Sequence, residues 1–99
     1  MSAYPDHPAI AKDHVKRAFW TAKEGKMSEA AAHLAQALWP PKNPEVYPAH
    51  KLPYWFRMAA QEAYEDLIAK REEEAVRTLK DVIYPYGIPA HETAIWRHR

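Results

Sequence analysis

Cysteine is absent from this chain of 99 residues, and glycine occurs only twice. Without cysteine the chain has no disulfide, no thiolate metal site and no cysteine nucleophile. The absence fits a reducing compartment. Two glycines provide no glycine-rich phosphate loop. They also leave few positions for left-handed turns, which favours a helical chain.

Long apolar runs and an excess of one charge are also missing. No run approaches the roughly 18 apolar residues that cross a bilayer. The N-terminus, MSAYPDHPAIAKDH, lacks the positive start and apolar stretch of a secretory signal. The 14 Lys and Arg residues are balanced by 13 Asp and Glu residues, so neither sign provides a general attraction to DNA or to a membrane. We expect a cytoplasmic protein with no membrane partner.

Large aromatic side chains are abundant. The chain contains four Trp and six Tyr residues. Its length is that of one small domain, predicted here to cover residues 1–99, whose core is modest. Because such a core cannot hold this many rings, the composition predicts that some rings lie on the surface.

The first half of the chain is predicted to form a helical hairpin over residues 8–39. Its first helix runs from about Pro8 to Glu24, and Gly25 follows as a left-handed stop. Ser28 is expected to cap the second helix, which continues to about Trp39. Apolar residues at helical spacing form one stripe per helix. The stripes are Ala11, Val15, Ala18 and Ala22 with Phe19, and then Met27, Ala30, Leu34, Ala37 and Leu38.

The second half is predicted to form an equivalent hairpin over residues 53–84. A proline-rich connector, residues 40–52, precedes it and is expected to be ordered and extended along the surface, and a tail over 85–99 forms either a short helix or an extended arm. Pro53 opens this hairpin as Pro8 opens the first. Its stripes are Phe56, Ala60, Ala63 and Leu67 with Ala59, and then Ala75, Val76, Leu79, Val82 and Ile83.

A shift of 45 residues superimposes the two halves. Eight identities result, and both pairs of core stripes coincide. The repeat predicts a turn near Ala69–Glu72. An unbroken helix over 53–84 would be roughly 48 Å long, too long for a compact domain with a radius of gyration of about 13 Å. One long helix, curved or used in a dimer, is the alternative, because the residues around the turn are compatible with a helix.

The first hairpin resembles a tetratricopeptide hairpin in having Gly25, Ala30, Ala37 and prolines after its second helix. His14 and Arg17-Ala18 stand at that family's aromatic and Leu-Gly positions, and the period is 45 instead of 34. The resemblance therefore implies a generic helical hairpin and no function. The fold predicted is all-α, with two antiparallel hairpins in a four-helix arrangement.

One side of the first helix carries lysines around a tryptophan. Lys12, Lys16, Trp20 and Lys23 lie opposite the core stripe. A Trp between lysines can stack on a nucleic-acid base while the amines meet phosphates. It can equally anchor a protein partner. The third possibility is a solvated face on which the tail or the connector covers Trp20.

Rings outside the core stripes are the candidates for a protein interface. Trp39 and Tyr84 follow corresponding helices and are expected to be structural. Trp and Tyr are enriched among residues that dominate binding energy. The predicted interface comprises Trp55, Tyr64, Trp96, Tyr54 and Trp20. A second copy of the chain and a different protein are equally good candidates for its partner.

Neither metal binding nor catalysis finds support in the sequence. Glu29 and His33 share a helical face, but the ligand spacings of di-iron and zinc helices are absent. Asp13 and His14 are adjacent and point to different sides of their helix. We therefore expect no catalytic, cofactor-binding or metal-binding residues. The sequence favours a non-enzymatic, regulatory or accessory binding protein that docks on another protein or on itself; a nucleic-acid binder is the alternative.

Overall fold

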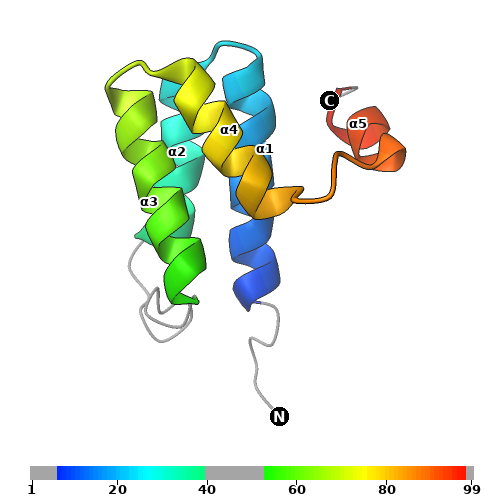
Figure 1. Cartoon of the computed structure of the whole chain (residues 1–99), viewed down its shortest axis with the longest axis horizontal. Coiled ribbons are helices and arrows are strands. Elements are labelled where there is room, and N and C mark those ends of the chain that lie inside the picture. Colours follow the sequence, from blue (N-terminus) through cyan, green and yellow to red (C-terminus); the bar gives the residue numbers. More distant parts are fainter. Residues whose placement is uncertain (1–6, 40–52, 98–99) are drawn as a thin grey trace.

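A computed structural model describes residues 7–39 and 53–97, and every secondary-structure element in these two ranges is a helix (Figure 1). The predicted all-α fold is confirmed for them. The connector, residues 40–52, which was predicted to be ordered and extended, lies outside the described residues. The helices are α1 (His7–Lys23), α2 (Met27–Leu38), α3 (Tyr54–Ile68), α4 (Glu72–Ile83) and α5 (Ala90–Arg97).

Four of the helices form a bundle. Helix α1 packs against α2 and α4, and α3 packs against the same two helices, so the contacts close into a ring. Neighbouring helices run antiparallel, and α5 lies to one side, beyond α1 and α4 (Figure 1). Helix α5 makes its main contact with α1. Helix α5 is therefore attached to the α1 side of the bundle.

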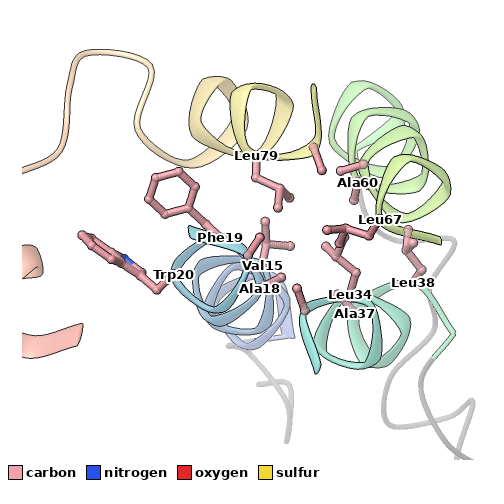
Figure 2. Packing of buried hydrophobic residues seen from close by; sticks show 14 of the residues in the cluster. Val15, Ala18, Phe19, Trp20, Leu34, Ala37, Leu38, Ala60, Leu67 and Leu79 are labelled. Carbon is pink, nitrogen blue, oxygen red and sulfur yellow. The ribbon is translucent and has the colours of Figure 1, made fainter. Parts of the chain in front are cut away.

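The core follows the predicted stripes. Val15, Leu34, Leu67 and Leu79 point into the space between the four helices (Figure 2). Eight of the 17 buried apolar residues are alanine, which lets the helices approach closely, and four are large rings: Phe19, Trp20, Phe56 and Tyr84. The predicted stripe residues are buried except Met27, Ala59, Val76, Val82 and Ile83, which are half-buried.

The two hairpin turns have the same backbone hydrogen bonds. In the first, Gly25 N–H donates to Ala22 O at 2.9 Å and Lys26 N–H donates to Thr21 O at 3.1 Å. In the second, Lys70 N–H donates to Leu67 O at 3.1 Å and Arg71 N–H donates to Asp66 O at 2.8 Å. This pairing is a Schellman motif, which requires a left-handed residue after the helix. Gly25 has φ +84° and Lys70 has φ +64°.

Two expectations about helix ends are settled by these turns. The segment 53–84 is broken between Ile68 and Glu72, as the predicted turn requires, so the alternative of one long helix is wrong. The prediction that Ser28 caps α2 is also wrong. Helix α2 begins at Met27, and its N-cap Lys26 makes no side-chain capping hydrogen bond. The Schellman turn sets this start, because the N–H of Lys26 closes the turn on Thr21 O and the next helix begins at the residue that follows, Met27.

Candidate functional site

The outer side of α3 carries most of the exposed apolar side chains in the described part of the chain. Four of the seven large exposed apolar residues belong to α3, and a fifth, Trp39, follows α2 and packs against α3. The exposed fraction is 61% for Trp55, 70% for Tyr54 and 53% for Trp39. We call this set the α3 surface. It comprises Trp39, Tyr54, Trp55, Met58, Tyr64 and Ile68.

Local contacts fix the orientation of two rings on the α3 surface. The ring of Trp39 meets that of Tyr64 edge to face, with 5.0 Å between centroids and planes at 78°. Trp55 makes a similar contact with Phe56, at 5.8 Å and 78°. Phe56 is buried in the core, whereas Trp55 lies outside it. Each exposed indole therefore rests on a ring of its own fold, which limits the conformational entropy that a partner would remove.

Trp20, unlike Trp39 and Trp55, is buried. On an ideal helix it is directly opposite the core stripe of α1, yet only 8% of it is exposed. Its Nε1–H donates to Tyr84 Oη at 3.1 Å, and Tyr84 O–H donates to Glu92 Oε1 of α5 at 2.8 Å. Figure 2 shows Phe19 and Trp20 extending away from the bundle centre, on the side of the C-terminal segment. The tail therefore covers Trp20, which was one of the three possibilities drawn from the sequence.

Glu92 is the polar anchor of α5. Lys16 Nζ lies 3.0 Å from its Oε1. Burial opposes ionisation, but hydrogen bonds from Tyr84, Lys16 and Trp96, together with the Lys16 charge, outweigh it and hold the pKa of Glu92 below 4.5. Burial is also the main cause that raises the pKa of Tyr84 to about 12. Both groups therefore keep, at neutral pH, the protonation states that their hydrogen bonds require.

The three lysines of the predicted nucleic-acid stripe differ in their contacts. Lys16 pairs with Glu92, as above, and Lys23 Nζ lies 5.5 Å from the centre of the Phe19 ring and 5.1 Å from that of Trp20. Lys12 is exposed. Stacking of Trp20 on a base would therefore require α5 to leave its place and Lys16 to lose its partner.

Polar side chains line the groove between α1 and α2. A hollow of about 180 Å³ is bounded there by Trp20 and Trp96 on one side and by charged and polar residues on the other. These are Arg17, Thr21, Glu24, Lys26, Glu29 and His33. Its charges are mixed, since Glu24 pairs with Lys26 within it. Burial, and then the Arg17 charge, lowers the pKa of the neighbouring His14 below 6.5. Within the described ranges, no three potential metal ligands come together.

The structure separates the five residues of the predicted protein interface into three groups. Tyr54 and Trp55 are exposed and adjacent on α3, and Tyr64 is half-buried beside Trp39. Trp96 is half-buried against the core at the far side of α1, and Trp20 is enclosed there. Sequence reasoning missed the exposure of Trp39, which it treated as structural like Tyr84, and it gave no role to Met58 or Ile68. The spacing of Met58 and Ile68 along the helix places both outside the α3 core stripe, so their exposure could have been predicted from the sequence.

A comparison with known protein families, characterised proteins and solved structures finds no match to this chain. No helix in the described ranges is both long enough and apolar enough to cross a membrane. Function must therefore be inferred from the chain's own surfaces.

Proposed function

We propose that this is a small non-enzymatic binding protein that docks on another protein through the α3 surface. The observation that carries the proposal is the concentration of exposed apolar side chains on and beside α3, where Tyr54, Trp55 and Met58 lie one turn or less apart. Contiguous exposed apolar side chains on a protein surface are typical of interaction sites. Rings that dominate binding energy are most often Trp and Tyr.

Docking on a partner would remove the exposed ring area of Tyr54 and Trp55 from water. A large aromatic side chain contributes an area of about 150–250 Å². With roughly two thirds of Trp55 and Tyr54 exposed, burial of each ring contributes about 2–4 kcal/mol at 25 cal/mol per Å². Arg57, on the same helix, is the candidate for a rim contact that orients the partner. Two such rings are enough to make this surface the main determinant of affinity.

A nucleic-acid function receives less support from the same geometry. Its stripe on α1 depends on Trp20, which is 8% exposed, and on Lys16, which already pairs with Glu92. A second copy of the chain is the other protein that the α3 surface could meet, since a twofold dimer would place the same rings against each other.

We further propose that residues 8–40 and 53–85 are two copies of one structural unit. The bounds of α4 are those of α2 shifted by 45 residues, and the left-handed residues Gly25 and Lys70 differ by the same 45. The residues that begin α2 and α4 agree as well, with φ −92° and ψ 72° at Lys26, and φ −95° and ψ 76° at Arg71. A twofold relation between the hairpins accounts for the matching α1–α4 and α2–α3 contacts.

The function is tested by affinity capture with the full chain in an extract of its source cells. We expect a protein partner that stays bound between about 50 and 200 mM salt, since apolar burial is insensitive to this change whereas phosphate contacts are not. The Trp55→Ala chain should lose the partner, and the Tyr86→Ala chain should keep it, because Tyr86 is fully exposed but lies outside the α3 surface.

Two results would contradict the proposed function. One is a partner retained by the chain in which Trp39 and Trp55 are both replaced by alanine. The other is a nucleic acid that is captured and then released by salt. Sedimentation of the pure protein identifies a second copy as the partner if the mass doubles and the Trp55→Ala chain returns to a monomer.

A further inference from the structure

Two ring pairs occupy corresponding places on opposite sides of the bundle. Phe19 of α1 meets Tyr84, which follows α4, at 5.5 Å and 67°. Tyr64 of α3 meets Trp39, which follows α2, at 5.0 Å and 78°. Phe19 and Tyr64 are 45 residues apart, and so are Trp39 and Tyr84. The twofold relation proposed above therefore exchanges one pair for the other.

Only one of the two pairs is covered by a helix of the described chain. Helix α5 lies over the Phe19–Tyr84 pair, and Tyr84 is 4% exposed, whereas Trp39 is 53% exposed. Glu92 is the residue of α5 that accepts the Tyr84 hydrogen bond and pairs with Lys16. The covered pair thus shows how this fold holds a short helix: apolar contact with the rings, and one carboxylate received by an amine and a phenol.

The charges around the uncovered pair are changed. Gln61 replaces Lys16 at the corresponding position, Glu65 replaces Trp20, and Ile68 replaces Lys23. Glu65 is exposed, and Ile68 is 58% exposed. Both amines are lost and one carboxylate is gained, so this site no longer favours an acidic residue in the place of Glu92.

We propose that Trp39, Tyr64 and Ile68 form the docking site for a short amphipathic helix of another protein, placed as α5 is placed on its own ring pair. That helix carries a basic residue where α5 carries Glu92, and its charge meets Glu65. This inference rests on the proposed function and names the chemistry of the partner. The α5 helix of a second copy is a poor occupant, because its Glu92 would face Glu65.

The test uses the full chain and a peptide probe. The probe is residues 85–97 with capped ends and Glu92→Lys, and the matched probe is the unchanged sequence. In the full chain α5 stays in its place because its effective concentration is in the millimolar range. The indole N–H signals of the isotope-labelled chain report which tryptophan each probe contacts. We expect the Glu92→Lys probe to shift Trp39 and not Trp20, and to bind about fivefold more tightly than the unchanged probe.

Charge reversal on the chain provides the control. Glu65→Lys should make the unchanged probe the tighter one, whereas Glu62→Lys, the same change elsewhere on α3, should leave the preference as it is. Both side chains are exposed, so neither change should affect folding.

Several outcomes would overturn the inference. These are no shift at Trp39, equal affinities for the two probes, preference of the unmodified chain for the unchanged probe, or protection of Trp39 by contacts with residues 40–52. Such an outcome leaves the proposed function standing if Trp55→Ala still loses the captured partner, so the two failures can be told apart.

Discussion

The second hairpin turn stores strain that a single substitution should relieve. Lys70 has φ +64° and occupies the left-handed position of a Schellman motif whose counterpart in the first hairpin is Gly25. A residue with a Cβ atom in this conformation costs roughly 1–2 kcal/mol. Glycine avoids that cost but gains about 0.4–1 kcal/mol of conformational freedom in the unfolded chain. Lys70→Gly should therefore raise the free energy of unfolding by about 0.5–1 kcal/mol.

Gly25→Ala should have the opposite effect on the free energy of unfolding, because Gly25 has φ +84°. A Cβ atom at Gly25 would lie 3.8 Å from Glu72 Oε1, an ordinary contact, so crowding does not contribute. The free energy of unfolding should fall by about 0.5–1 kcal/mol for conformational reasons alone. For a domain of this size each change corresponds to about 2–8 °C in melting temperature.

Thermal and urea unfolding, followed by circular dichroism, measure both effects. Lys12→Gly is the matched control, because Lys12 is exposed within α1 and glycine there should cost about 1 kcal/mol. The reasoning is refuted if Lys70→Gly destabilises the protein as Lys12→Gly does. That result would mean that the two turns are not equivalent in conformation.

Two further predictions concern buried polar groups. Tyr84→Phe removes the hydroxyl between Trp20 and Glu92 and should lower the free energy of unfolding, measured in urea, by about 1–3 kcal/mol. Tyr86→Phe should have no effect, because Tyr86 is fully exposed. Equal stability of the two variants would contradict a stabilising role for the Trp20–Tyr84–Glu92 hydrogen bonds. Folding lowers the pKa of His14, so His14 takes up its proton at a higher pH in the unfolded chain than in the folded one. The free energy of unfolding should therefore fall as the pH drops through 6.5. His14→Gln should flatten this dependence between about pH 5 and 7 in a urea series, and an unchanged slope would show that His14 does not cause it.

The core and the helix order follow from the sequence because helical periodicity is a local property. The four predicted stripes contain nearly all of the buried apolar residues of the bundle. The break before Glu72 was also predictable, although Lys70 is not a glycine, since the repeat predicted from the sequence and the size of a compact domain both favour it.

The surroundings of the rings were less predictable because they depend on contacts distant in sequence. Trp20 lies opposite the core stripe, and only the docking of α5, some 70 residues later, encloses it. Trp39 directly follows α2 and Tyr84 directly follows α4, yet α5 covers Tyr84 and not Trp39. Periodicity assigns a residue to a face of its helix; it does not show what lies against that face.

The central claim is that the two indoles of the α3 surface, Trp39 and Trp55, are exposed to solvent in the isolated chain. It is tested most directly by incorporating 5-fluorotryptophan into the otherwise unchanged chain and measuring how a soluble paramagnetic agent relaxes its four fluorine signals. Single Trp→Phe variants assign the signals. Trp39 and Trp55 should be relaxed several times more strongly than Trp20, in line with their exposed fractions of 53%, 61% and 8%. Protection of Trp39 and Trp55 equal to that of Trp20 in the isolated protein would contradict the claim.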